Sequence, residues 1–370
     1  MIPQTIQDVD AAWLGDVLGA RLSQFAVTQI GQGVGIMGDI YRVHVTYAEE
    51  RGDQPESVVV KLPSSFEENR SQGVALGMFE AEVRFYNELA PAVAAGLPRI
   101  YRADVEAGTA NFVIVMEDLS DLVLVEQSIG MSPQQAEAAV RAIAGVHAVW
   151  WGSAKQADLE WIPSMVSERI TFLDQLLLEI LPVFKDGFAE LLPPGGVELY
   201  EAVAGNSMKI NQRLAGRSPW TVVHQDCRVE NMLFGDEQHV ALLDWQGIGR
   251  GPGAYDLAYL LGGSLDVELR RAHEEALVRS YHQRLQEFGV EDYAWAELWD
   301  DYGHAQMMGG LATSMLTGGG MDLGNERGRQ LIATMASRHA TAALDHGAVS
   351  YTHLRAHETK TRISDSLVGV

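Results

Sequence analysis

The chain has 370 residues, 47% of them hydrophobic and 21% charged, a balance typical of a globular protein that can bury a full core. With 50 acidic and 27 basic residues, its formal charge is −23, which opposes binding to nucleic acid or to an anionic membrane. The single cysteine, Cys227, excludes an internal disulfide and favours a reducing, cytoplasmic compartment. We find neither an apolar run of membrane-spanning length nor the pattern of a signal peptide, so we expect no membrane partner.

The N-terminal region predicts one packing helix over residues 5–19 and then a glycine-rich hairpin. Three glycines between the apolar segments 25–30 and 39–47 satisfy G-x-G-x-x-G: Gly33, Gly35 and Gly38. A dinucleotide-binding loop must open a helix, whereas the residues after Gly38 alternate as a strand does. We therefore expect these glycines to join two antiparallel strands, where backbone N–H groups can lie over phosphates. A glycine-rich hairpin without a ligand is the alternative.

A β-branched strand over 57–63 carries one basic residue, Lys61, and a helix beginning near Phe79 follows it. Glu82 lies within the apolar face of that helix at helical spacing, whereas Glu80 points away from it. We therefore predict an ion pair between Lys61 and Glu82. A solvated Glu82 is the alternative.

Residues 111–116 are typical of a buried strand and are followed by Glu117, Asp118 and Leu119, where we predict the first domain to end. Ser132 and Gln135 form a capping-box start for a long helix. His147 lies in the apolar stripe of that helix, and we interpret it as a core histidine with satisfied hydrogen bonds.

The strongest pattern in the chain is the stretch 224–231 with Asp244 beyond it. Asp226, Asn231 and Asp244 occur at the spacing of the groups with which a kinase orients a hydroxyl and holds magnesium. β-prone runs end at His224 and Asp244, so we expect these polar groups at strand ends, facing one cleft. In this hypothesis Asp226 accepts the proton of the attacking hydroxyl, while Asn231 and Asp244 supply oxygen ligands to Mg²⁺. The alternative is that these residues only cap turns.

This stretch resembles the catalytic and metal loops of the aminoglycoside phosphotransferase and choline kinase superfamily, and most of all its ecdysteroid-kinase-like branch. Asp226 matches the catalytic aspartate of that superfamily, and Asn231 and Asp244 match its metal ligands. Asp256 matches the buried aspartate that braces the catalytic loop. Gln225 departs from the pattern, because the family usually has glycine at that position.

The resemblance implies an α+β, bilobal protein-kinase-like fold. Its small N-terminal lobe, residues 1–118, would hold an antiparallel sheet and a helix, and its larger, mainly helical lobe, 119–347, the catalytic and substrate-binding residues. Lys61 would contact the phosphates of ATP, and backbone groups of 117–119 would bind adenine. His224 would support the catalytic loop.

The C-terminal part narrows the class of substrate. The segment between Asp244 and Asp256 is short and rich in glycine, and it lacks the A-P-E of protein kinases, which argues against a protein substrate. Residues 266–347 predict helices broken at 318–320. Residues 348–370 share no periodicity with what precedes them, and we expect them to be non-native or disordered.

The sequence thus predicts an ATP- and Mg²⁺-dependent kinase of a small-molecule hydroxyl, with no obligate protein partner. One alternative is an antibiotic kinase acting on an aminoglycoside or macrolide. Another is a non-catalytic homologue that binds a nucleotide or small molecule. The acceptor, the choice between ATP and GTP, and the oligomeric state are not legible in the sequence.

Overall fold

The computed structural model describes residues 2–31, 37–50, 52–153, 157–236, 239–320 and 326–347. Two glycines of the predicted phosphate loop, Gly33 and Gly35, lie outside these residues, as does the segment 348–370. The chain divides into two compact units, Met1–Val123 with Val240–Ile248, and Leu124–His239 with Gly249–Val370. The sequence predicted a boundary at residue 118 and did not place 240–248 with the N-terminal residues.

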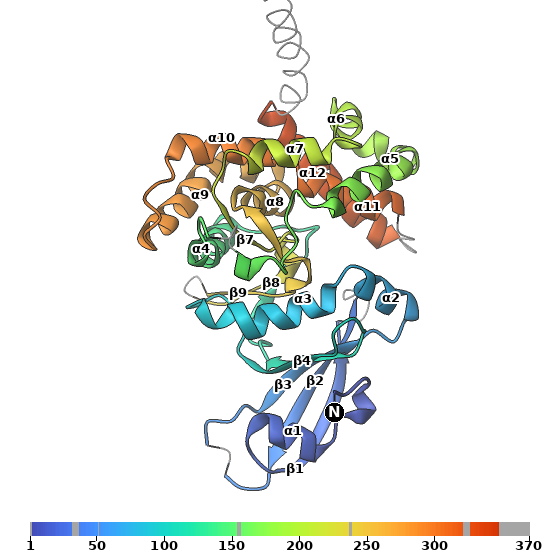
Figure 1. Cartoon of the computed structure of the whole chain (residues 1–370), viewed down its shortest axis with the longest axis vertical. Coiled ribbons are helices and arrows are strands. Elements are labelled where there is room, and N and C mark those ends of the chain that lie inside the picture. Colours follow the sequence, from blue (N-terminus) through green and yellow to red (C-terminus); the bar gives the residue numbers. More distant parts are fainter. Residues whose placement is uncertain are drawn as a thin grey trace, which may run out of the picture. The chain divides into compact units, whose positions relative to one another are not determined.

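The first unit is built on a five-stranded antiparallel sheet of order β1-β2-β3-β5-β4 (Figure 1). Its elements are α1 (Ala11–Leu18), β1 (Leu22–Ile30), β2 (Gly38–Tyr47), β3 (Ser57–Pro63), α2 (Glu67–Ala75), α3 (Met78–Arg84), β4 (Ile100–Val105), β5 (Phe112–Glu117) and β9 (Val240–Leu242). The predicted hairpin pairing of 25–30 with 39–47 is present, with Phe25 opposite Val45. The single helix predicted over 5–19 is wrong: a 3₁₀ turn, Ile6–Asp8, precedes α1, because Asp10 caps α1 by accepting a bond from Trp13 N at 2.8 Å.

The alternation of β3 decides what each face of this sheet carries. Val58, Val60 and Leu62 point to one side, where Leu14 of α1 packs with them in a buried cluster. Lys61 points to the other side, because successive side chains along a strand point to opposite faces of the sheet. Its cross-strand partner is Ile114 of β5, and α3 packs on this second face through a stacked Phe79–Phe112 pair at 4.7 Å. The strand therefore directs one lysine toward α3.

The second unit is mainly helical (Figure 1). Its elements are α4 (Pro133–Val149), α5 (Glu168–Phe188), α6 (Gly196–Val203), α7 (Ser207–Ala215), β7 (Trp220–Val223), β8 (Met232–Phe234), β10 (Gly249–Pro252), α8 (Ala254–Ser264), α9 (Val267–Glu287), α10 (Trp295–Ala305), α11 (Gly309–Gly320) and α12 (Glu326–Asp345); β6 (Val123–Leu124) lies at the boundary. The predicted capping box of α4 is present, since Ser132 and Gln135 exchange hydrogen bonds of 2.9 and 3.2 Å. Residues 318–320, where the sequence predicted a break, form the last turn of α11, which ends at Gly320.

In this unit α4 packs on α9, α5 on α11, and α8 on α12. The short β7 pairs with β10 in an antiparallel ribbon, with Val223 opposite Gly249. No described helix, in either unit, is long and apolar enough to cross a membrane.

Candidate active site

Lys61, Glu82 and Asp244 form a charge cluster in the first unit, in which Lys61 and Glu82 are buried. Lys61 Nζ lies 2.8 and 2.9 Å from the two carboxylate oxygens of Glu82 and 3.0 Å from Oδ1 of Asp244. Glu82 is 1% exposed, so the predicted pair is present and the solvated alternative is wrong. Burial by itself would lower the pKa of Lys61, but the charges of Asp244 and Glu82 outweigh it and raise that pKa above its ordinary value. The lysine is therefore held as a cation between two carboxylates.

Asp244 reaches this cluster because the chain turns sharply after β9. Its φ is +62°, a left-handed conformation that a non-glycine residue rarely adopts. The next residue, Trp245, is 1% exposed and stacks on Phe85 at 3.9 Å, which fixes the turn against the helical segment that carries Glu82. About two-fifths of the Asp244 side chain stays exposed.

Gly38 occupies the first position of β2, opposite Pro63 of β3. A Cβ at this position would lie 2.9 Å from the carbonyl oxygen of Leu62, so close strand packing is sufficient reason for glycine here. Its role in a phosphate loop stays a prediction.

The predicted hinge, 117–119, uses its side chains for structure. Glu117 accepts a bond from Arg99 N at 2.7 Å, and Asp118 accepts bonds from Arg42 Nε at 2.8 Å and Ser57 Oγ at 2.7 Å. Burial would raise the pKa of Asp118, but the bonds from Ser57 and Arg42 outweigh it and lower that pKa. Leu119 accepts a backbone bond from Leu122 N at 3.0 Å. The carboxylates of Glu117 and Asp118 are therefore engaged within the protein, and adenine binding by residues 117–119 stays a prediction.

In the second unit, the predicted catalytic loop follows β7 and brings Asp226 and Asn231 together. Asn231 Nδ2 donates to the Asp226 carbonyl at 2.8 Å and to its Oδ2 at 2.9 Å. Tyr259 of α8 donates its hydroxyl to Oδ1 of Asp226 at 3.0 Å, and Arg228 Nε lies 3.4 Å from Oδ2. The carboxylate is thus held by named donors on both oxygens, while 35% of the Asp226 side chain remains exposed.

Asp256 of α8 holds the backbone of this loop. Its carboxylate accepts bonds from His224 N at 2.6 Å and Gln225 N at 3.0 Å, so the predicted brace is present in the geometry. His147 bonds Asp256 Oδ2 through Nε2 at 3.1 Å and the Tyr281 hydroxyl through Nδ1 at 2.7 Å, which confirms it as a satisfied core histidine. His224 is also buried.

Gln225 has a left-handed backbone conformation. Its φ is +68°, in the left-handed region that glycine enters without strain. Its side chain lies over Gly249, where an added Cβ would come within 2.3 Å of Nε2. Gln225 therefore has a backbone conformation that is typical of glycine. The absence of a side chain at Gly249 leaves room for the Gln225 side chain.

Sequence reasoning missed Tyr259. The signal that could have found it is its spacing: it lies three residues after Asp256, so one face of α8 carries both residues. Burial, followed by the charge of Asp226, raises the pKa of Tyr259 well above its ordinary value, so this residue is a hydroxyl donor at neutral pH. Cys227 is inert, because burial raises the pKa of its thiol.

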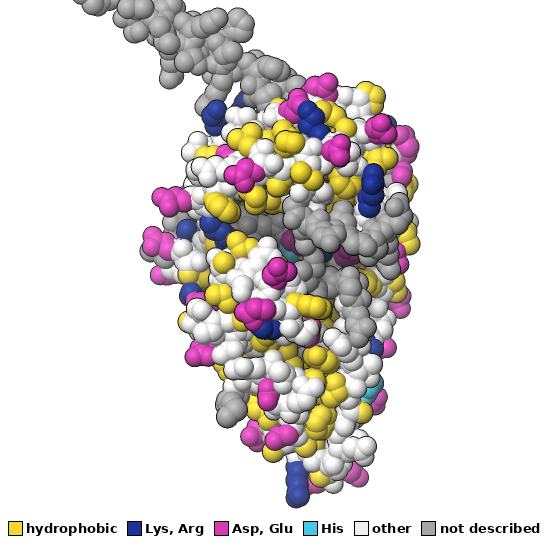
Figure 2. All heavy atoms as spheres, turned by 90° about the vertical axis from the view of Figure 1, so that its right-hand side faces the viewer, with side chains coloured by type: hydrophobic (Ala, Val, Ile, Leu, Met, Phe, Trp, Pro, Cys, Tyr) yellow, Lys and Arg dark blue, Asp and Glu magenta, His cyan; other side chains and the backbone are white. Residues whose placement is uncertain are grey.

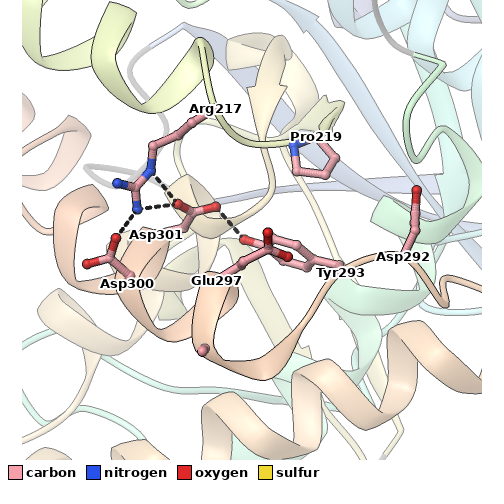
Figure 3. A pocket seen from close by; sticks show the side chains of 8 residues that line it. Arg217, Pro219, Asp292, Tyr293, Glu297, Asp300 and Asp301 are labelled. Atoms are coloured by element: carbon pink, nitrogen blue, oxygen red, sulfur yellow. Dashed lines mark hydrogen bonds and ion pairs between the residues drawn. The ribbon is translucent and has the colours of Figure 1, made fainter.

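A surface pocket of about 480 Å³ lies in the second unit, near the start of β7 (Figure 3). Asp301 in its wall is 3% exposed and accepts bonds from Arg217 at 2.9 Å and Tyr293 at 2.7 Å. Asp301 therefore ties α10 to Arg217 and Ser218, the residues just before β7. The catalytic loop follows the other end of that strand, so this pocket is not the candidate active site.

Each unit, taken by itself, offers one oxygen donor of the kind that Mg²⁺ binds. In the second unit, Asn231 uses its amide N–H groups on Asp226, so its carbonyl oxygen is the atom that can bind a metal. In the first unit, Asp244 offers a carboxylate that is about two-fifths exposed. Among the described residues no three His, Cys, Asp or Glu side chains gather into a metal cluster. Magnesium that keeps water and phosphate ligands needs only one or two protein oxygens.

These features define a kinase-like α+β fold, and comparison with known proteins agrees. The ecdysteroid kinase-like family matches residues 32–291, and the chain belongs to that family. An uncharacterized kinase-like protein of Caenorhabditis elegans is 28% identical over 100 residues, so the match spans only about a quarter (26%) of either chain.

Solved structures give the same fold at low identity. A choline kinase of Cryptosporidium parvum superposes with a TM-score of 0.53 at 10% identity, covering 88% of this chain and 89% of its own. Spectinomycin phosphotransferase, solved with ADP and spectinomycin, gives a TM-score of 0.51 at 11% identity, covering 90% and 98%. At such identities the likeness concerns the fold alone.

Proposed function

We propose that this protein is a phosphotransferase that moves the γ-phosphate of ATP to a hydroxyl of a small molecule, with Mg²⁺ as its metal. The observation that carries the proposal is Asp226, a partly exposed carboxylate held on both oxygens by Asn231 and Tyr259. An oriented carboxylate beside an amide metal ligand is what hydroxyl phosphorylation needs. The Lys61–Glu82–Asp244 cluster supports it, because a lysine held between carboxylates is pre-organised for phosphate oxygens.

In this proposal Asp226 orients the acceptor hydroxyl and takes its proton as the new O–P bond forms. The bond between the γ-phosphorus and the bridging oxygen breaks, and ADP leaves. Lys61 neutralises charge on the nucleotide phosphates. Asn231 and Asp244 would hold Mg²⁺, which neutralises further phosphate charge when bound.

Several finer assignments belong to the same proposal. Main-chain groups of 117–119 would bind adenine, and Gly33, Gly35 and Gly38 would cover the phosphates. The net charge of −23 disfavours nucleic acid and anionic membranes as partners. A single buried cysteine suits a reducing, ATP-rich cytoplasm.

The first experiment measures transfer of labelled γ-phosphate from Mg·ATP to hydroxylated lipids, sterols, amino alcohols, aminoglycosides and macrolides. Transfer to an antibiotic, together with resistance of an expressing bacterium, would favour the antibiotic-kinase alternative. Mg²⁺-dependent ATP binding without transfer to any compound would instead favour a non-catalytic homologue.

The variant Asp226→Ala tests the catalytic assignment on whichever acceptor the screen finds. We expect turnover to fall by about a hundred- to ten-thousand-fold while ATP binding is kept, because the variant removes the proton acceptor but not the phosphate contacts. Asp236→Ala, an exposed carboxylate in a turn of the same unit, is the matched control and should keep wild-type turnover. Undiminished turnover in the Asp226 variant would refute the assignment.

A further inference from the structure

We propose that Tyr259 is a positioning residue, which fixes the Asp226 carboxylate in the rotation that receives the acceptor hydroxyl. This inference rests on the proposed phosphotransferase function. Its geometric basis is the 3.0 Å bond from the Tyr259 hydroxyl to Oδ1 of Asp226, opposite the 2.9 Å bond from Asn231 to Oδ2. Each carboxylate oxygen therefore has its own donor, and the group cannot turn without breaking both bonds.

Tyr259 is itself immobilised, as a positioning residue must be. It is 2% exposed, and the ring of His339 from α12 lies edge-on to it at 5.4 Å between centroids. His339 fits there only because two glycines leave room: a Cβ on Gly263 or Gly310 would come within 2.3 or 2.2 Å of its ring. Tyr259 is thus buried beside His339 of α12, which is itself packed against Gly263 of α8 and Gly310 of α11.

The same helix face contacts the loop twice. Asp256 binds the backbone N–H groups of His224 and Gln225, and Tyr259, one turn later, binds the side chain of Asp226. The first contact sets the path of the chain, and the second sets the rotation of the reactive group. Because both contacts come from one helix, the Asp226 carboxylate keeps a fixed position relative to the backbone of the loop.

The lone-pair directions of Asp226 that no donor occupies indicate where the acceptor hydroxyl binds. A carboxylate offers about four lone-pair directions. Asn231 and Arg228 approach Oδ2, whereas Tyr259 approaches Oδ1. The geometry therefore points to Oδ1 as the atom that receives the hydroxyl proton, with Tyr259 holding that oxygen in place.

The test compares Tyr259→Phe with wild type on Mg·ATP and the acceptor found by the phosphate-transfer screen. We expect kcat to fall by about ten- to a hundred-fold, with the KM for ATP unchanged, because orientation is lost while nucleotide contacts remain. The control is Tyr200→Phe. It also removes a buried phenol hydroxyl with a hydrogen bond, here to Ser314 at 2.8 Å in the same unit, and should keep wild-type kcat.

A double-mutant cycle distinguishes positioning from general damage to the fold. If Tyr259 acts through Asp226, adding Tyr259→Phe to Asp226→Ala changes the residual rate by less than about two-fold. Independent, multiplicative losses in the double variant, or wild-type kcat in Tyr259→Phe, would overturn the inference and leave the phosphotransferase proposal standing. If the wild-type protein transfers phosphate to none of the acceptors, both the phosphotransferase proposal and the inference about Tyr259 fail.

Discussion

At the scale of single residues, the candidate site depends on pairing buried charges. Lys61 would be costly to bury alone, since an ion in a protein interior loses several kcal/mol of hydration. Glu82 meets it with two bonds and Asp244 with a third. Helical spacing was enough to choose Glu82 over Glu80 from the sequence. The approach of Asp244 to this lysine was not foreseen, because it depends on a left-handed turn 183 residues away along the chain.

The variant Glu82→Gln removes one charge from this cluster and keeps nearly the same shape. We expect the KM for ATP to rise by about ten-fold, because Lys61 is then held less firmly for phosphate. The measurement is initial rate against ATP concentration. Glu80→Gln, on the same helix, is the control and should leave the KM unchanged; equal effects of both variants would contradict a specific role for the pair.

Two buried histidines predict how stability depends on pH. Burial lowers the pKa of His339 to about 3 and that of His304 to about 4, both below the ordinary value of about 6.5. A depressed folded-state pKa contributes stability that is complete above the unfolded pKa and is lost as the pH falls toward the folded value. We therefore expect the free energy of unfolding to decrease from about pH 6.5 downward, by up to about 1.4 kcal/mol per pH unit for each histidine.

Urea unfolding at several pH values checks this expectation. His339→Gln should flatten the slope below about pH 6.5, because it removes one titrating group. His44→Gln, at an exposed position of β2, should leave the slope as it is. An unchanged slope in the His339 variant would show that its titration does not govern acid stability.

At the scale of elements, α8 organises the second unit. Its Asp256 and Tyr259 hydrogen-bond the predicted catalytic loop, it packs against α12, and it is almost entirely buried. The sequence predicted the role of Asp256 through a family resemblance. It did not predict that α11 and α12 enclose the same helix, because such packing joins segments that lie far apart along the chain.

The variant Gly310→Ala tests this packing. The added Cβ would lie 2.2 Å from the ring of His339, so ring or helix must shift, and we expect a loss of about 1–3 kcal/mol in the free energy of unfolding. Gly187→Ala is the matched control. This glycine is also helical, but a Cβ there meets no atom within 4 Å, and we expect a gain of up to about 1 kcal/mol. Denaturant titration of both variants measures the difference, and a neutral Gly310→Ala would contradict tight packing around His339.

At the scale of the whole molecule, the chain is an acidic protein of two units, with a formal charge of −23. On the face drawn in Figure 2, Asp and Glu side chains are spread over the surface among fewer Lys and Arg side chains. Residues 240–248 belong to the first unit, although the residues on both sides of them belong to the second. This segment includes Asp244, which contacts Lys61. The first unit therefore includes a segment that lies more than a hundred residues after its other strands.

Nucleotide binding should stabilise this protein as a whole. If Mg·ATP binds the folded chain only, its free energy of unfolding rises by about 2.7 kcal/mol at a concentration 100 times Kd. Thermal unfolding with Mg·ATP should give a higher midpoint than with Mg²⁺ alone, and Lys61→Met should abolish the shift. A shift that persists in the Lys61 variant would place the nucleotide elsewhere.

The sequence by itself determined the local elements and the groups capable of chemistry. Alternation predicted the hairpin and β3, helical spacing selected Glu82, and the interval from Asp226 to Asn231 predicted the catalytic loop, since each pattern reflects backbone geometry within a few residues. Only the tertiary structure decided that Asp244 contacts Lys61, that Tyr259 hydrogen-bonds Asp226 and that His339 packs edge-on against Tyr259. Those contacts join residues distant along the chain, and they depend on turns, packing and glycine clearances that no local pattern encodes.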